Sequence, residues 1–193
     1  MKTKILKPVI AAIFALIAIN AVAQECGVYK TYEDYVNGKM EVSINCKTEK
    51  GKIKPNDFHN KEYITVIKNG EKTDYKKGEI FGYQNCNGEF FRFLNNERLA
   101  LADKSDLWIF SKEEVVSHSP FTGTKTVTKY YFSLNDGEEI KSLTFNNLKD
   151  ALPGNKVLFS EMELLFSSNS ALHSYNQSTG AFKINSFLTS KGW

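Results

Sequence analysis

The sequence predicts an α+β fold, with a mainly antiparallel sheet or small open barrel in the N-terminal two-thirds and short helices packed on it from the C-terminal third. Asn-Gly recurs at 37–38, 69–70 and 87–88, and Asp-Gly follows at 136–137. These dipeptides are strong signals for the tight turns of β-hairpins. The segments between them are rich in β-branched and aromatic residues, which strands favour. Helical spacing appears only after these segments, and strands followed by helices are typical of α+β proteins.

The first predicted helix lies between Thr31 and Gly38. Thr31 can cap this helix, with Asp34 three residues later, and Gly38 ends it. The alternation of apolar and polar residues from Met40 to Cys46 then predicts a half-buried strand. Residues 51–60 are predicted to form a loop, because the segment contains a proline and many polar residues.

The middle of the chain is predicted to form a series of antiparallel strands. A loop is expected over 117–124, where Pro120 and Gly123 interrupt the pattern. The expected strands are Glu62–Lys68, Glu71–Tyr75, Glu79–Gln84, Glu89–Leu94, Arg98–Ala102, Asp106–Lys112 and Thr126–Leu134.

The C-terminal third is predicted to form short helices. Phe145, Leu148 and Leu152 share one helical face, and Pro153-Gly154 ends that helix. Ser160, with a glutamate three residues later, has the pattern of a capping box and predicts a helix over 162–166. A further helical turn is expected over 171–175.

Residues 1–23 have the three-part pattern of a cleavable secretory signal peptide. A lysine-rich start precedes the apolar run Val9–Ile19, and small residues occupy the positions that a signal peptidase reads, Ala21 and Ala23. The apolar run is shorter than the roughly 20 residues of a membrane-spanning helix. We therefore expect residues 24–193 to form a single exported globular domain without a stable membrane span after cleavage. Periplasm, outer surface and extracellular space all remain open as its location.

The charge of the mature domain argues against a nucleic-acid partner. The whole chain carries 25 Lys and Arg against 22 Asp and Glu. The lysines within residues 1–23 account for the entire excess, so the mature domain is nearly neutral. A neutral domain has no general attraction for the phosphate backbone.

Three cysteines lie in the exported part of the chain, Cys26, Cys46 and Cys86. An oxidising compartment favours a disulfide, and three pairings exist, each leaving one thiol. We expect Cys26–Cys46, with Cys86 free, because Cys26 lies near the mature N-terminus, where a tether is useful. The wide spacing of the cysteines is unlike the close ligand spacing of most metal sites, so no metal site is predicted.

No catalytic residue and no cofactor site is predicted. The sequence contains no G-x-S-x-G, no P-loop and no dinucleotide fingerprint. Aromatic residues are the other candidates, since they fall on both faces of the predicted strands. One interpretation is ordinary packing on both faces. The other is an exposed patch or pocket for a partner or apolar ligand, formed by Tyr83, Phe91, Trp108 and Tyr131.

Three segments carry a resemblance to a known family. The mature chain opens with the stretch Gly27–Tyr35, which contains Gly-x-Tyr followed by Glu-Asp-Tyr. A Gly-aromatic stretch leads into Cys-x-Gly within Phe81–Glu89, and Leu143–Leu148 is the third segment. Together they resemble uncharacterised exported β-rich proteins of Bacteroidota-type Gram-negative bacteria. The resemblance implies a cell-envelope setting and no particular activity.

Three functional hypotheses follow. The first is a non-enzymatic cell-envelope or secreted protein that binds an envelope protein or an apolar small molecule through its sheet. The second is a secreted hydrolase with a dispersed active site. The third is a structural accessory of a surface assembly. An enzyme should show a deep cleft with convergent titratable groups, a ligand binder a closed apolar cavity, and an accessory a flat exposed apolar patch.

Overall fold

The computed structural model describes residues 24–119, 123–134, 137, 139–152 and 156–193. The predicted signal peptide, residues 1–23, lies outside this part of the chain. Among the described residues, no helix is long and apolar enough to cross a membrane.

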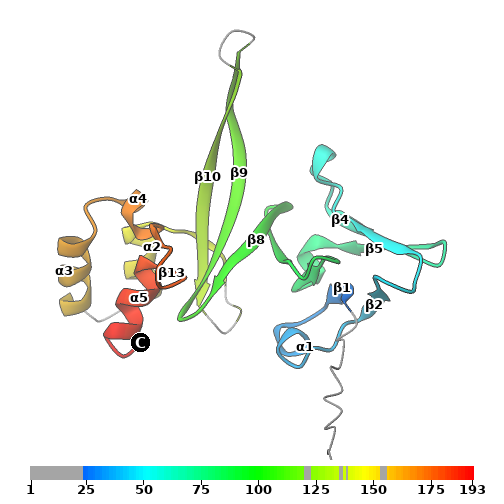
Figure 1. The fold of residues 1–193 in the computed structure, drawn as a ribbon, viewed down its shortest axis with the longest axis horizontal. Coiled ribbons are helices and arrows are strands. Elements are labelled where there is room, and N and C mark those ends of the chain that lie inside the picture. Colours follow the sequence, from blue (N-terminus) through cyan, green and yellow to red (C-terminus); the bar gives the residue numbers. More distant parts are fainter. Residues whose placement is uncertain (1–23, 120–122, 135–136, 138, 153–155) are drawn as a thin grey trace, which may run out of the picture.

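An eight-stranded antiparallel sheet forms the body of the protein (Figure 1), in the order β11-β10-β9-β8-β7-β6-β1-β2. A smaller sheet has the order β3-β4-β5, and β12 pairs with β13. The sheets do not close into a barrel, and the α+β prediction is confirmed. The strands are β1 (Glu25–Tyr29), β2 (Val42–Asn45), β3 (Gly51–Lys54), β4 (Tyr63–Lys68), β5 (Glu71–Lys76), β6 (Gly82–Gln84), β7 (Phe90–Leu94), β8 (Glu97–Lys104), β9 (Leu107–Ser119), β10 (Gly123–Leu134), β11 (Lys141–Ser142), β12 (Tyr175–Asn176) and β13 (Ala181–Phe182).

Five α-helices accompany the sheets, and most of them follow the last long strand. They are α1 (Tyr32–Val36), α2 (Phe145–Ala151), α3 (Lys156–Leu165), α4 (Asn169–Leu172) and α5 (Lys183–Ser190). Two 3₁₀ turns, η1 (Asp57–His59) and η2 (Lys77–Glu79), flank the hairpin of β4 and β5. The C-terminal helices lie at one end of the molecule and the smaller sheet at the other (Figure 1).

Local sequence signals account for several of these elements. The capping box of α1 is confirmed: the Thr31 hydroxyl accepts a hydrogen bond from the Asp34 N–H, and the Asp34 carboxylate accepts one from the Thr31 N–H. Asn69 and Gly70 turn β4 into β5 with φ of 52° and 90°, as a hairpin turn with two left-handed residues requires.

Several local predictions were wrong, among them the helical turn over 171–175, which is α4 followed by β12. The predicted loop 51–60 contains β3, an edge strand whose charged side chains conceal its pairing with β4. The predicted loop 117–124 is largely strand, because β9 continues to Ser119 and β10 begins at Gly123; residues 120–122 lie outside the described part. Ser160 does not cap a helix. It lies inside α3, and its hydroxyl donates to the Lys156 carbonyl, the local alternative to capping.

The two faces of the large sheet carry separate cores, because side chains alternate along each strand. On one face, Trp108, Phe110 and Tyr131 belong to an aromatic cluster against which Tyr32 and Tyr35 of α1 pack. On the opposite face the next residues in sequence, such as Ile109 and Phe132, pack with the C-terminal helices.

The smaller sheet covers the other end of that second face. Ile64 and Val66 of β4 join a core that includes Tyr83 of β6 and Phe91 of β7. The second face therefore has two caps: the smaller sheet over β1, β6 and β7, and the helices over β9 and β10.

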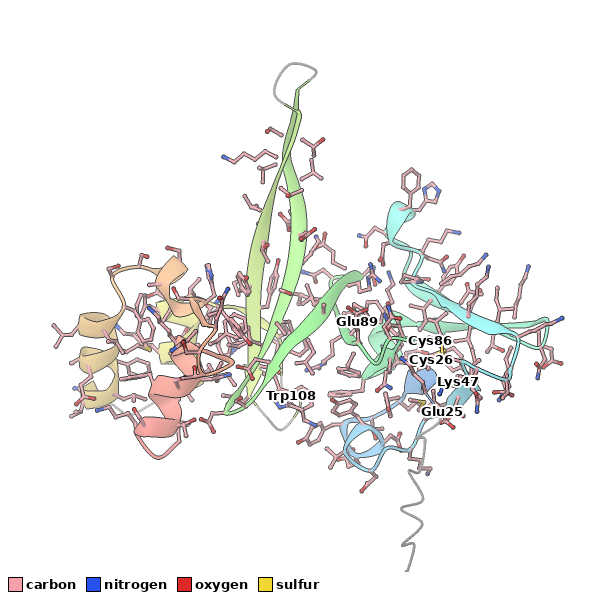
Figure 2. All side chains as sticks on the ribbon, viewed as in Figure 1. Glu25, Cys26, Lys47, Cys86, Glu89 and Trp108 are labelled. Atoms are coloured by element: carbon pink, nitrogen blue, oxygen red, sulfur yellow. A yellow bond between two sulfur atoms is a disulfide. The ribbon has the colours of Figure 1, made fainter. Side chains whose placement is uncertain are left out.

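The four aromatic residues proposed as a ligand or partner surface do not form an exposed patch. Tyr83, Phe91, Trp108 and Tyr131 are 2%, 7%, 2% and 8% exposed. Tyr83 and Phe91 lie under the smaller sheet, while Trp108 and Tyr131 lie in the aromatic cluster beside α1. Figure 2 shows Trp108 at the base of the β9–β10 hairpin. Ordinary packing on both faces, the other interpretation, accounts for all four.

The disulfide also differs from the expected one. Cys46 pairs with Cys86, with a Cα–Cα distance of 5.7 Å, and Cys26 is a buried thiol. The sheet order explains this pairing. Strand β1 lies between β2 and β6, Cys46 follows β2, and Cys86 follows β6, so the bond passes beside Cys26. Closing a 40-residue separation stabilises the fold by about 4 kcal/mol in the chain-entropy model.

The helical cap predicts a large cost for truncating the strand residue beneath it. Phe132→Ala should lower the free energy of unfolding by about 3–5 kcal/mol, because it opens a cavity in the core between the large sheet and the C-terminal helices. Urea denaturation followed by circular dichroism measures this change. Val157→Ala, at an exposed position of α3, is the control and should change it by less than about 0.5 kcal/mol. Equal effects of the two substitutions would contradict the assigned core.

Candidate functional site: the central cleft

A cleft opens on the second face of the large sheet, in the gap between the two caps. One row of cross-strand neighbours runs from Tyr83 through Phe91, Ala100 and Ser111 to Tyr130. Direct cross-strand neighbours lie on the same face of a sheet. The ends of this row are aromatic and covered, whereas its middle consists of the small residues Ala100 and Ser111. Because these side chains are small, they leave a depression on the sheet surface between the two caps.

The cleft has a volume of about 520 Å³. We call it the central cleft. It is formed by η1, the residues after it, and the neighbouring strands β7, β8 and β9. Its lining residues are Asp57, Asn60, Phe91, Asn96, Glu97, Arg98, Ala100, Ser111, Lys112 and Glu113.

An ion cluster holds one wall of the central cleft. The Arg98 guanidinium lies 2.9 Å from the Asp57 carboxylate, which ties β8 to η1. The Lys77 ammonium lies 3.7 Å from the same carboxylate and donates a hydrogen bond to the Asn96 carbonyl at 2.8 Å. Lys77 is only 3% exposed, and burial lowers the pKa of its ammonium. Asp57 therefore compensates a buried positive charge as well as an exposed one.

The backbone turn between β7 and β8 makes this wall possible. Asn95 and Asn96 both have positive φ, 51° and 66°, as the two-residue turn between Leu94 and Glu97 requires. Asparagine tolerates this conformation better than most residues. The turn directs the Asn96 carbonyl to Lys77, so an Asn-Asn dipeptide was a usable hairpin signal beside the Asn-Gly pairs.

The floor of the cleft is an aromatic ring with a cation over it. The Arg98 guanidinium carbon lies 4.9 Å from the centre of the Phe91 ring, and the guanidinium donates a hydrogen bond to the Tyr83 hydroxyl at 3.2 Å. Stacking and the two polar contacts fix the orientation of the guanidinium. The cleft thus presents a held positive charge beside an apolar surface.

A second charge network forms the rim on the β9 side. The Lys112 ammonium lies 2.7 Å from Glu97 and 3.3 Å from Glu114, and Lys129 lies 2.6 Å from Glu114. Burial alone would lower the pKa of Lys112, but its hydrogen bonds to both glutamates outweigh burial and raise it. The hydrogen bond from Lys129 lowers the pKa of Glu114. Both side chains are held in their charged forms.

The chemistry of the cleft suits binding better than acid–base catalysis. Two of the three carboxylates that line the cleft, Asp57 and Glu97, are each paired with a cation. The cleft instead offers fixed charges of both signs, held above the buried Phe91 ring. This combination suits a polar chain such as a peptide backbone.

The hairpin of β9 and β10 extends from one side of this cleft, and we call its outer part the arm. The β9–β10 ladder runs from Leu107↔Leu134 to Ser119↔Gly123. Strand β8 pairs with β9 only as far as Ser111, and β11 pairs with β10 only at Tyr131 and Phe132. Figure 1 shows the arm extending beyond its neighbours. Within the described strands, residues 113–117 of β9 have no ladder partner on the edge that faces β8, because β8 pairs with β9 only up to Ser111.

The cysteines are the candidate metal ligands of the described part of the chain. The sulfur atoms of Cys26, Cys46 and Cys86 lie within 4.8 Å of one another. Two of these sulfurs are joined in the disulfide, which removes them as thiolate ligands. The arrangement in this structure is therefore a disulfide beside a thiol.

Sequence reasoning found Phe91 and Tyr83 but assigned them to the wrong environment, since they support the cleft from below. It missed Arg98, Asp57, Lys77 and Lys112. Their charges are spread over the sequence, and only the pairing of β7 with β8 and β9 brings them together. The small residues Ala100 and Ser111, which create the opening, give no signal of their own.

No family model matches the chain, and the searches of curated proteins and of solved structures gave no significant match.

The ion cluster predicts a measurable role for Asp57. Asp57→Asn removes the carboxylate that compensates the buried Lys77 ammonium, and it should lower the free energy of unfolding by about 2–3 kcal/mol, since removing one partner of a buried pair is costly. Thermal or urea unfolding at neutral pH measures the change. Glu79→Gln, which breaks the exposed pair with Lys76, is the matched control and should leave stability unchanged. An Asp57→Asn variant with unchanged stability would contradict the proposal that Asp57 compensates the buried Lys77 charge.

Proposed function

We propose that the protein is a non-enzymatic binding protein of the cell envelope or extracellular space. Its partner is another protein, which supplies an extended segment that lies in the central cleft and adds as a strand to the free edge of β9. The observation that carries this proposal is the unpaired edge of β9, which begins beside the cleft and continues along the arm.

An unpaired strand edge offers backbone donors and acceptors in a row, which is the basis of binding by strand addition. Many proteins protect such edges by keeping them short or covered. Here β9 extends eight residues, 112–119, past its last pair with β8 at Ser111. Val115 is 64% exposed and Val116 50% exposed, so apolar side chains accompany the free backbone.

The central cleft gives such a segment a place to continue past the arm. A strand added to β9 above Ser111 occupies the row that β8 fills below, and it meets Glu97 and Arg98 at the start of β8. The cations Arg98 and Lys112 and the acceptor Asn60 line this point. Fixed charges of both signs favour a polar segment and give selectivity more than raw affinity.

An exported location supports the same proposal. The disulfide is of the kind that persists in oxidising compartments, and residues 1–23 have the pattern of a signal peptide. Both are compatible with export to the periplasm, outer surface or medium.

The other hypotheses have weaker support. An apolar small molecule needs an apolar pocket, and the central cleft is lined mainly by charged and amide side chains. A shallow groove between α3 and α5, beside Leu164, Leu165 and Phe187, is more apolar. For a hydrolase, two of the three carboxylates that line the cleft, Asp57 and Glu97, are engaged with cations, and the third, Glu113, is an exposed residue of β9.

Peptide selection with mapped contacts tests the proposal. Peptides selected from a random displayed library on the purified mature protein should be crosslinked by benzoylphenylalanine placed at Val115. The same photoreactive residue at Val157, a valine of similar exposure on α3, should give no crosslink. Ser111→Phe fills the floor of the cleft and should weaken peptide binding at least tenfold, measured by fluorescence anisotropy.

Ser178→Phe, at an exposed turn far along the chain, is the control for added aromatic bulk and should bind normally. Both phenylalanine variants should retain the circular dichroism spectrum of the parent. Crosslinking at position 157 rather than 115, or full affinity in a folded Ser111→Phe variant, would overturn the proposed binding mode.

A further inference from the structure

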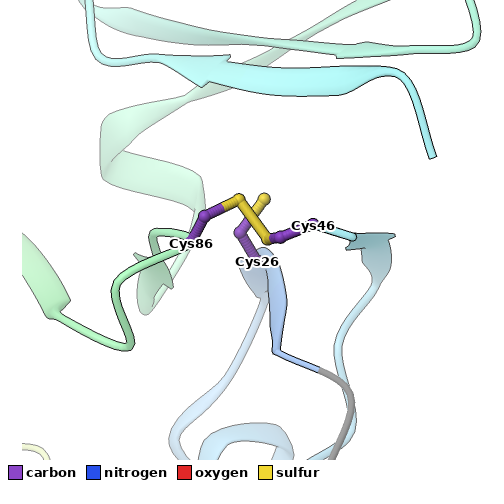
Figure 3. A group of neighbouring side chains, drawn as sticks. All are labelled: Cys26, Cys46 and Cys86. Atoms are coloured by element: carbon purple, nitrogen blue, oxygen red, sulfur yellow. A yellow bond between two sulfur atoms is a disulfide. The ribbon is translucent and has the colours of Figure 1, made fainter. Parts of the chain in front are cut away.

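The three cysteine side chains meet at one point of the large sheet, in the core that the smaller sheet covers. Figure 3 shows Cys26 on β1 beside the bond that joins Cys46 to Cys86. The three sulfur atoms lie within 4.8 Å of one another. Cys26 is 1% exposed, whereas Cys46 and Cys86 are half-buried. A free thiol thus lies next to a disulfide of the same chain.

We propose that these cysteines form an internal thiol–disulfide exchange unit, in which Cys26 attacks Cys46 and releases the thiol of Cys86. The Cys26 thiol first loses its proton to solvent. Its thiolate then attacks the Cys46 sulfur, so that a Cys26–Cys46 bond forms and the Cys46–Cys86 bond breaks. The electron pair leaves on the Cys86 sulfur, which takes up a proton. One disulfide and one thiol exist before and after, so no oxidant or reductant is consumed.

The strand register favours Cys46 as the sulfur that is attacked. Cys26 pairs with Ile44 in the β1–β2 ladder, and Cys46, two residues further along, lies diagonally across on the same face. The Cys46 N–H donates to the Gln24 carbonyl at 3.0 Å, which holds the two chain segments together. A Cys26–Cys46 bond therefore joins neighbouring strands that are already paired.

The released thiol would lie in a more accessible place than Cys26. Cys86 belongs to the turn that joins β6 to β7, and its neighbours Asn87 and Gly88 are exposed. Exchange thus moves the thiol of the protein from the core to a turn. In an oxidising compartment this turn becomes a site for a mixed disulfide with another thiol, or for modification by a thiol-reactive electrophile.

Burial makes the exchange slow at neutral pH and faster in base. The thiolate is the attacking species, and burial raises the pKa of the Cys26 thiol, with the charge of Glu49 acting in the same direction. The thiolate fraction therefore increases about tenfold with each pH unit below that pKa. The rate of Cys86 exposure should follow the same dependence.

Alkylation under native conditions tests the proposal. The oxidised mature protein is incubated with N-ethylmaleimide, without denaturant, at several pH values up to about pH 9. The reaction is quenched near pH 3, because acid halts thiol–disulfide exchange. Peptide mass spectrometry then maps the labelled cysteines and the disulfide. The expected result is a label on Cys86 together with a Cys26–Cys46 disulfide, appearing about tenfold faster per pH unit. Labelling confined to Cys26, or no label before denaturation, would overturn the proposal.

Two variants make the result unambiguous. Cys26→Ser keeps the resting disulfide but lacks the attacking thiol, so Cys86 should stay unlabelled under all native conditions. Cys86→Ser leaves only Cys26 and Cys46, which should oxidise to a disulfide and show no thiol when titrated in denaturant. Two free thiols in the Cys86→Ser protein after oxidation would show that these sulfurs do not join, and would contradict the exchange.

Discussion

The antiparallel pairing of β9 with β10 is the interaction on which the rest of the structure depends. It seats the aromatic cluster on one face through Trp108 and Tyr131, and the helical cap on the other through Ile109 and Phe132. Because side chains alternate along a strand, one hairpin serves both cores. The same ladder, continued past its neighbours, forms the exposed arm.

The central cleft is a consequence of how two caps share one face. The smaller sheet and the helices each cover one end of the large sheet, and the small residues Ala100 and Ser111 lie on the stretch between these two caps. Ion pairs between Arg98 and Asp57 and between Lys112 and Glu97 hold the two sides of that gap. A partner segment entering there gains fixed charges and a free strand edge in one place.

The sequence carried enough information for the fold class, the capping box of α1 and the Asn-Gly turn between β4 and β5, because these depend on local signals. It failed where local signals were absent. The arm exposes both faces to solvent, so its residues show no apolar alternation, and β3 is an edge strand rich in lysine. The cleft and the Cys46–Cys86 bond depend on strand order, which no short pattern encodes. The single-domain organisation of 24–193 and the export signal remain predictions.

Hydrogen–deuterium exchange on the mature protein, with and without a saturating selected peptide, tests the central claim most directly. Strand addition places new hydrogen bonds on the free edge of β9, so amides within 113–117 should exchange at least tenfold more slowly in the complex. Amides of α5 should be unchanged. Protection confined to α3 and α5, with the β9 edge exchanging as in the free protein, would contradict the account.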